Sequence, residues 1–326
     1  MEKLDKRDKK ILYHLSNNSR QGFSKIAKKV NLSKNAVNYR VERLQKQGII
    51  KKFLPNINMG VLGVTTYDLL IKLKSKPEEE QKILNYLKNH DNTVWMVKLS
   101  GEWDILLEVV VKDLDDFSQT LSQIFEKLGN KIDKYETHID METYKVIPLI
   151  EDFFEELELP KQKTKRQEGY LKLDEKDKKI LYELSQDGLI QQYKIAEKIN
   201  TSPDSVAYRM KRLEKQGIII THVPSIDMKT LGYSDYLLIL DLRNPKKEEI
   251  TKLKQYIINN KNITYAFRGA TRFEVILFIT VKDTKNFDLM LKEIKNKFYN
   301  IIQNQKFMLI TEDLQFTLFP KAMLNY

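Results

Sequence analysis

Apolar residues recur at helical spacing in the first part of the chain and later form strand-like runs. Asp5 is a suitable N-cap for a first predicted helix, and Ser24–Val30 is predicted to form a short second one. Ser33–Gly48, SKNAVNYRVERLQKQG, opens on a capping Ser, carries a narrow apolar stripe at helical spacing and ends at a glycine. Three helices joined by short connections, the last one polar and basic, predict a helix-turn-helix with Ser33–Gly48 as its recognition helix.

The pattern changes after Gly48. Ile49–Leu54 and Ile57–Met59 are predicted to be two small strands, punctuated by Pro55–Asn56, which would form a wing carrying Lys51 and Lys52. Residues 1–60 are therefore predicted to be a winged helix-turn-helix domain.

Residues 61–150 alternate between strand-like and helix-like segments. The predicted order is strand, helix, strand, strand, helix, strand, over Thr66–Leu73, Glu78–Asn89, Val94–Leu99, Ile105–Val111, Asp115–Leu128 and Lys134–Thr143. Ser100–Gly101–Glu102 is predicted to be the hairpin turn between the two central strands. This order is typical of a ferredoxin-like βαββαβ domain, so the fold class is α+β.

The chain repeats itself. Leu4–Ser16, LDKRDKKILYHLS, returns as Leu173–Ser185, LDEKDKKILYELS, at an offset of 169 residues, and the offset is 170 by Val111–Asp113, which returns as Val281–Asp283. A period this long indicates a duplicated two-domain module. The second copy comprises a winged helix-turn-helix over 173–229 and a ferredoxin-like domain over 230–326. Between the copies, 151–172 is predicted to be an acidic helix followed by a flexible linker.

The composition favours some classes of function and argues against others. A net charge of +11 and a pI near 9.3 favour a polyanionic partner. The chain has no cysteine, and its histidines, His14, His90, His138 and His222, are scattered without metal spacing. It shows no secretory signal, no membrane span and no catalytic or cofactor-binding motif. We therefore expect a cytoplasmic protein that needs no cofactor and is not an enzyme.

Polar and basic side chains cover the outward faces of both predicted recognition helices and suit phosphates and base edges. The candidate DNA-binding set is Ser33, Lys34, Asn35, Asn38, Tyr39, Arg40, Arg43, Lys46, Lys51, Lys52, Ser202, Asp204, Ser205, Tyr208, Arg209, Lys211 and Arg212.

Several members of this set have a structural alternative. Tyr39 and Tyr208 suit either a phosphate or the core against the preceding helix. Arg40 and Arg209 suit either DNA or acidic residues such as Asp8 and Asp177. Asp204 can stabilise its helix N-terminus or accept from cytosine.

The two recognition helices differ in their outward residues. Lys34, Asn35 and Asn38 become Pro203, Asp204 and Ala207, whereas the apolar stripe persists. We therefore expect two half-sites with different sequence preferences.

The motifs LDKRDKKIL, LSKNAVNYRVERLQKQGII and SGEWD together resemble the Lrp/AsnC family of bacterial and archaeal transcription regulators. The resemblance implies that the ferredoxin-like domains pair through their sheets, within the chain or between chains. It also implies that Ser100, Gly101, Trp103 and Asp104 lie near a small-molecule effector site, usually for an amino acid. The second copy reads GATRFE there, so its ligand is expected to differ or to be absent.

An enzyme and an architectural DNA-binding protein are the alternatives. Siroheme decarboxylases look like members of the same superfamily, tandem fusions occur among them, and their pattern places a histidine in the second strand of the ferredoxin-like domain. The corresponding segments here, NTVWMVKLSGEWD and NITYAFRGATRFE, contain none. The leading hypothesis is a sequence-specific regulator of transcription that binds double-stranded DNA and a small metabolite.

Overall fold

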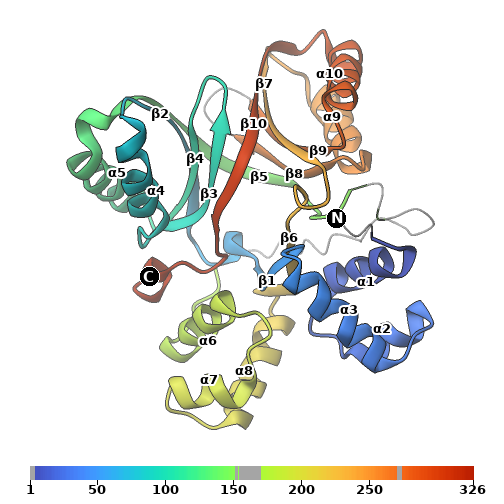
Figure 1. The fold of residues 1–326 in the computed structure, drawn as a ribbon. Helices are drawn as coiled ribbons and strands as arrows, with labels where there is room; N and C mark the ends of the chain where they lie inside the picture. Colours follow the sequence, from blue (N-terminus) through green and yellow to red (C-terminus); the bar gives the residue numbers. More distant parts are fainter. Residues whose placement is uncertain (1–3, 151–152, 154–169, 270–273) are drawn as a thin grey trace. The chain divides into compact units, whose positions relative to one another are not determined.

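A computed structural model describes residues 4–150, 153, 170–269 and 274–326 (Figure 1). The chain divides into two compact units, each assembled from both copies of the repeat. Unit 1 contains Met1–Val64, Asp152–Leu231 and Thr317–Tyr326, and unit 2 contains Thr65–Glu151 and Gly232–Phe316. Most of the predicted acidic helix and linker, 151–172, lies outside the described residues.

In unit 1, the first module consists of α1 (Lys6–Asn17), α2 (Phe23–Val30) and α3 (Lys34–Lys46). Asp5 and Asp8 form a capping box at the start of α1, and Ser33 caps α3 by accepting from the Ala36 N–H. Ile11, Leu15 and the stripe Val37, Val41 and Leu44 are buried and form the small core. The three predicted helices are confirmed.

The second module of unit 1 repeats this arrangement in α6 (Glu175–Gln186), α7 (Gln192–Lys198) and α8 (Pro203–Lys215). Asp174 and Asp177 form the capping box, and Ser202 caps α8. Val206, Met210 and Leu213 are the buried stripe of α8.

The two modules of unit 1 share one antiparallel ribbon. β1 (Ile50–Ile57) pairs with β6 (Ile219–Ile226), and Pro55 lies opposite His222. The prediction of two strands per wing is therefore wrong, because each module contributes one strand and Met59–Val61 forms a short 3₁₀ helix instead. The strand-forming sequence finds its partner in the other copy.

Polar contacts on both sides of this ribbon join the modules. Ser19 donates its backbone N–H to the carbonyl of His222 at 2.7 Å, and Gly188 donates to Phe53 at 2.8 Å. Arg20 donates to the carbonyls of Gly188 and Ile190 at 2.8 and 2.6 Å. The helical modules are thus paired within one chain.

Unit 2 contains two ferredoxin-like modules, as predicted. The first runs β2 (Thr65–Leu73), α4 (Pro77–Lys88), β3 (Thr93–Ser100), β4 (Ile105–Val111), α5 (Leu114–Leu128), β5 (Ile132–Val146). The second runs β7 (Ser234–Leu242), α9 (Lys247–Asn259), β8 (Ile263–Gly269), β9 (Glu274–Val281), α10 (Thr284–Phe298), β10 (Ile302–Phe316).

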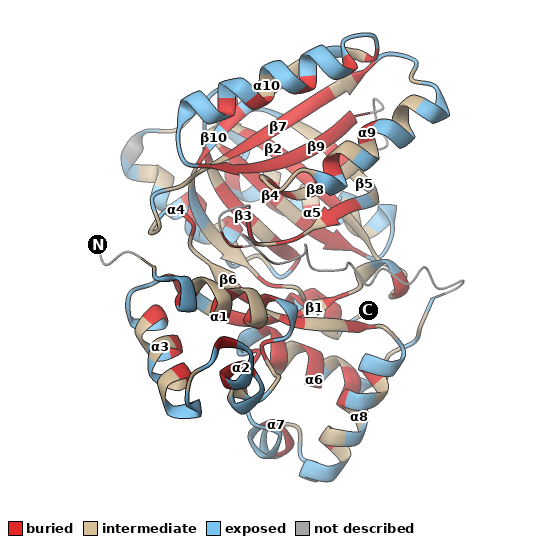
Figure 2. Ribbon diagram, turned by 90° about the vertical axis from the view of Figure 1, so that its right-hand side faces the viewer, coloured by how far each residue is buried: buried red, intermediate tan, exposed pale blue. Residues whose placement is uncertain are grey.

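The strands of unit 2 close into one antiparallel barrel in the order β10-β3-β4-β2-β5-β8-β9-β7. The four strands of each module form one half of this barrel, and we call each half a sheet. The joins between modules are β5 with β8 and β10 with β3. Helices cover the outer face of each sheet, where Figure 2 shows buried strands beneath helices with exposed outer surfaces. A third apolar layer, which includes Leu70, Trp103, Leu237 and Phe278, lies between the sheets.

The segment after β10 belongs to unit 1. The carbonyl of Phe319 accepts a 3.1 Å hydrogen bond from the Ser185 hydroxyl on α6, and a short 3₁₀ helix, η4 (Lys321–Leu324), follows. The second ferredoxin-like domain therefore ends at Phe316 and not at the last residue. Among the described residues, none of the helices has the length and apolar character needed to cross a membrane.

Candidate nucleic-acid interface and ligand-binding turn

The recognition helices α3 and α8 present an exposed polar face. Tyr39 and Tyr208, at equivalent positions, are 66% and 68% exposed, so neither belongs to the core. Both hydroxyl-bearing side chains therefore face solvent, where each could contact a phosphate.

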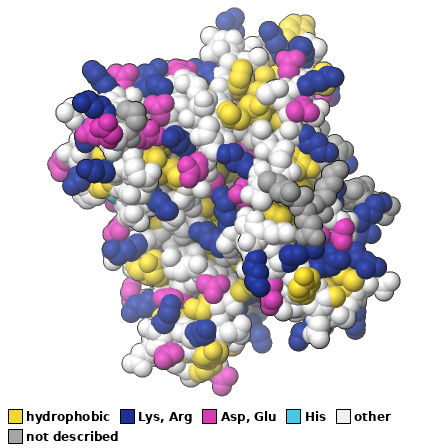
Figure 3. Space-filling view, in the orientation of Figure 1, with side chains coloured by type: hydrophobic (Ala, Val, Ile, Leu, Met, Phe, Trp, Pro, Cys, Tyr) yellow, Lys and Arg dark blue, Asp and Glu magenta, His cyan; other side chains and the backbone are white. Residues whose placement is uncertain are grey.

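The remaining side chains of the candidate set divide by exposure. Exposed members are Ser33, Lys34, Asn35, Lys46, Lys51, Ser202, Asp204 and Lys211, and partly buried ones are Asn38, Lys52 and Ser205. Asn38 donates to Glu42 on the same helix at 2.7 Å. Figure 3 shows Lys and Arg side chains gathered over the α1–α3 module.

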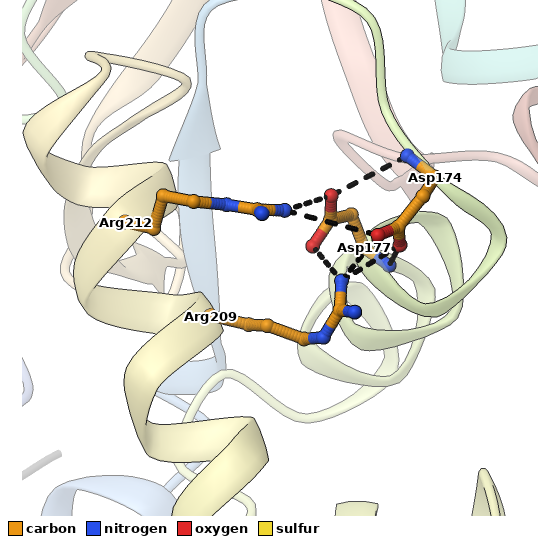
Figure 4. A network of polar contacts seen from close by, with 4 residues as sticks. All are labelled: Asp174, Asp177, Arg209 and Arg212. Atoms are coloured by element: carbon orange, nitrogen blue, oxygen red, sulfur yellow. Dashed lines mark hydrogen bonds and ion pairs between the residues drawn. The ribbon is translucent and has the colours of Figure 1, made fainter.

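Arginines of each recognition helix contact aspartates at the start of the first helix of the same module. In the second module, Arg209 donates to Asp174 and, at 2.9 Å, to Asp177, while Arg212 also bonds Asp177 (Figure 4). Asp177 is only 2% exposed, so its charge needs these partners. The hydrogen bond to Asp174 is the largest influence on Arg209 and raises its pKa further above the usual range.

The first module repeats this network residue for residue. Arg40 donates to Asp5 and Asp8 at 2.7 and 2.8 Å, and Arg43 donates to Asp8 at 2.7 Å. Arg40 and Arg209 therefore make the contacts to Asp8 and Asp177 that the structural alternative predicted. These arginines fix the angle of the recognition helix against α1 or α6.

The turn Ser100–Gly101–Glu102 joins β3 and β4, as predicted. Gly101 has φ of 140°, which favours glycine, and a Cβ there would lie 3.3 Å from the Met308 side chain on β10. Asp104 accepts from the Leu73 N–H at 2.7 Å and from Lys72 Nζ at 2.8 Å. The turn is therefore anchored to β2 and packs against the other module.

Within this turn, exposure separates core from surface. Trp103 is 1% exposed and packs between the sheets, with Lys134 Nζ 4.6 Å from its ring centre. Ser100 and Gly101 are exposed and Asp104 is partly buried. A ligand approaching here would meet Ser100 and Gly101 before any part of Trp103.

The ion pair between Asp104 and Lys72 has no counterpart among the described residues at the equivalent strand ends of the second copy. Asp241 replaces Lys72, so Glu274, which takes the place of Asp104, has no lysine at that position. The Glu274 carboxylate instead lies 2.7 Å from Nδ1 of His138 on β5 of the other module. Residues 270–273 lie outside the described part of the chain.

Some buried or bridging polar residues were not among the functional candidates predicted from the sequence. Asp68 and Glu108 lie at inward positions of β2 and β4, and neither was singled out. The signal that could have found them is a carboxylate inside an apolar strand, as in ILLEVVV around Glu108. Arg20 was missed because its partners lie 168 and 170 residues away.

Comparison with known proteins identifies the domains. The family model for winged helix-turn-helix DNA-binding matches residues 4–51 and 173–220, and the model for the Lrp/AsnC ligand binding domain matches 69–149. The described His, Asp and Glu residues form no group of three or more that could hold a metal ion.

Relatives support the same assignment. The HTH-type transcriptional regulator Ptr1 of Methanocaldococcus jannaschii is 34% identical over 127 residues, which are 39% of this chain and 85% of Ptr1. An uncharacterized HTH-type transcriptional regulator of Pyrococcus furiosus is 28% identical over 145 residues, 44% of this chain and 94% of that protein.

Solved structures of a siroheme decarboxylase match both modules together. The siroheme decarboxylase NirDL superposes with a TM-score of 0.63 at 12% identity, over 98% of this chain and 96% of NirDL. At that identity the likeness establishes a common fold. By its sequence, the chain belongs to the Lrp/AsnC family of helix-turn-helix transcriptional regulators, with two winged helix-turn-helix matches and one match to the family's ligand binding domain.

Proposed function

We propose that this regulator binds double-stranded DNA as an intrachain pseudo-dimer, with α3 and α8 in successive major grooves. The observation that carries the proposal is the β1–β6 ribbon, which pairs two recognition helices within a single polypeptide. Helix-turn-helix dimers read half-sites about one helical turn, roughly 34 Å, apart. A single chain would then supply both halves of such a reader.

The two halves are expected to read different sequences. Lys34 and Asn35 stand at the exposed start of α3, whereas Pro203 and Asp204 stand at the start of α8. Asn can pair bidentately with adenine, while Asp repels phosphate and accepts from cytosine. The proposed operator is therefore an asymmetric pair of half-sites.

Selection of random duplex DNA by the full chain tests this proposal. We expect enrichment of two unlike half-sites about one helical turn apart, with an affinity that falls steeply as salt rises. A perfect palindrome would refute the asymmetry. No enrichment, with weak binding that disappears at higher salt, would refute sequence-specific binding.

Variants should avoid the arginines, since Arg43 and Arg212 hold buried aspartates. Tyr39→Ala and Lys34→Ala should each weaken binding by about three- to tenfold and affect only the α3 half-site. Tyr208→Ala should affect only the α8 half-site. Lys88→Ala, at an exposed lysine of α4, is the matched control and should leave DNA binding unchanged.

We also propose an amino-acid-like effector at the Ser100–Asp104 turn, supported by the ligand-domain match and by the exposure of Ser100 and Gly101. A bound effector should raise the unfolding temperature of unit 2 and change DNA affinity by the factor by which DNA changes effector affinity. Calorimetric titration with the standard amino acids checks this.

Asp104→Asn removes the charge that pairs with Lys72 and loosens the anchored turn. We expect it to weaken effector binding by about tenfold or more, which corresponds to 1.4 kcal/mol. Asp133→Asn, at an exposed aspartate of the same module, is the control. Equal effector affinities for the two variants would place the ligand elsewhere.

The fold shared with NirDL is the observation that favours the enzyme alternative. We propose a regulator and not a decarboxylase because β3 and β8 contain no histidine and both recognition helices keep an exposed polar face. Absorption spectroscopy with an iron-porphyrin tests the alternative. Tight stoichiometric binding with product formation would favour the enzyme.

A further inference from the structure

Carboxyl groups of the first ferredoxin-like module point into the space between the two sheets of unit 2. Glu108 on β4 lies directly opposite Asp68 on β2, and Asp68 lies opposite His138 on β5. Asp140, two residues after His138 on β5, extends the row and accepts a 3.4 Å hydrogen bond from Thr66 on β2. Asp68 and His138 are 3% and 5% exposed, and Glu108 and Asp140 are partly buried.

The register fixes the direction in which this row faces. Leu69 and Leu107, which flank Asp68 and Glu108, belong to the core beneath α4 and α5. Successive side chains of a strand point to opposite faces, so the acidic row faces the sheet of the other module. Like charges directly opposite each other on neighbouring strands destabilise a sheet.

The fold does not require these charges. The second module carries apolar residues at the equivalent positions, and all of them are buried in the layer between the sheets: Leu237, Phe278, Met308 and Ile310. The same architecture therefore has an acidic half and an apolar half.

The second module adds one more carboxylate to the row. Glu274 is 1% exposed and reaches His138 over Gly269, where an added Cβ would lie 2.7 Å from the Glu274 side chain. A side chain at position 269 would therefore collide with Glu274. Asp140 lies opposite Gly269 in the β5–β8 join, so the cluster spans the contact between modules.

Bases on the neighbouring strands have other partners. Arg268 on β8 lies 3.5 Å from Glu142, and Lys306 on β10 lies 3.6 Å from Glu136. From β7, the charged residues are the acids Asp235 and Asp241. Within the described part of the chain, His138 is the base that contacts one of these carboxylates, that of Glu274.

Burial and mutual repulsion hold protons on these carboxyl groups. Burial, followed by Asp140 and Glu108, raises the pKa of Asp68 well above its usual range. Burial, with Asp140 adding to it, raises the pKa of Glu108 to about 8. Burial raises the pKa of Asp140 to about 7, against the hydrogen bond from Thr66 and the charge of His138, which lower it.

We propose that the cluster Asp68, Glu108, Asp140, Glu274 and His138 is a pH-sensitive switch that loosens the pairing of the two ferredoxin-like modules as pH rises through neutrality. This switch goes beyond the proposed function, and its action does not depend on DNA or an effector. A carboxyl group with a higher pKa in the folded state holds more protons when folded, so stability falls with rising pH. For Glu108 the loss extends from the unfolded value near 4 to about 8, and for Asp140 it ends at about 7.

The chain's two tryptophans make the test specific. Trp95 and Trp103 both lie in unit 2, so tryptophan fluorescence of the full chain reports on this unit. Urea unfolding is followed by fluorescence from pH 5.5 to 9. We expect the folding equilibrium constant of the wild type to fall by about tenfold per pH unit for each carboxyl group that titrates.

The triple variant Asp68→Asn, Glu108→Gln, Asp140→Asn should abolish most of this slope, and Glu293→Gln on α10 should keep it. If the triple variant does not fold, Glu108→Gln alone should reduce the slope by about one proton. A flat wild-type profile, or an unchanged slope in Glu108→Gln, would overturn the proposal.

Discussion

Asp177→Ala is expected to lower the free energy of unfolding of the second helical module by about 3 kcal/mol. Asp177 is 2% exposed, bonds both Arg209 and Arg212, and closes the capping box of α6 with Asp174. The variant removes all of these interactions at once and leaves two partly buried guanidinium groups short of a partner. The start of α6 and the seating of α8 should loosen together.

Urea unfolding monitored by circular dichroism gives the size of this loss, and hydrogen exchange over 174–186 gives its location. Asp288→Ala, which breaks an exposed pair with Lys292, is the control and should cost less than about 0.5 kcal/mol. Asp8→Ala should repeat the effect in the first module. Equal losses for Asp177→Ala and Asp288→Ala would contradict a structural role for the network.

Gly188→Ala is expected to destabilise unit 1 by about 2–3 kcal/mol and to separate its two modules. An added Cβ would lie 2.6 Å from the carbonyl carbon and oxygen of Phe53 and 2.7 Å from the backbone nitrogen of Leu54. These are backbone atoms of β1 and cannot rotate away. The Gly188 N–H bond to Phe53 and the adjacent contact of Arg20 would be lost with the shift.

Gly22→Ala is the matched control for Gly188→Ala. Gly22 has φ of −57°, and an added Cβ there would meet nothing within 4 Å, so we expect a change of less than about 0.5 kcal/mol. Hydrogen exchange of β1 and β6 checks the location. Unchanged protection of both strands in Gly188→Ala would contradict the role of this glycine in joining the modules.

These two predictions change how DNA-binding variants are interpreted. Arginines on a recognition helix suggest base or phosphate contacts, yet Arg43 and Arg212 hold buried aspartates. An alanine at either position would lower DNA affinity by misplacing the helix even without a lost base contact. Tyr39, Tyr208 and Lys34 are exposed and test the interface more directly.

Local sequence signals were sufficient for most of the secondary structure. The capping Ser and Asp residues, the apolar stripe of each recognition helix and the β-rich runs placed helices and strands close to their observed bounds, and β4 at Ile105–Val111 was predicted residue for residue. The repeat predicted two equivalent modules. The helices and strands depend on residues at most a few positions apart, and the repeat is visible by comparing the sequence with itself, which is why the sequence alone carries these features.

The pairing of strands was decided by the tertiary structure. Ile50–Ile57 has the composition of a strand, but nothing local indicates that its partner is Ile219–Ile226, about 170 residues away. The prediction of a hairpin wing failed for that reason. The closure of unit 2 through β5–β8 and β10–β3 is equally non-local.

The roles of polar side chains depended on the same long-range contacts. The sequence proposed two partners for Arg40 and two environments for Tyr39, and only burial and distance distinguished them. The acidic row became visible once the strand register placed Asp68 between Glu108 and His138. The sequence by itself determined the modules and their family, whereas folding decided which charges meet, because desolvation and pairing act between residues that are distant in the chain.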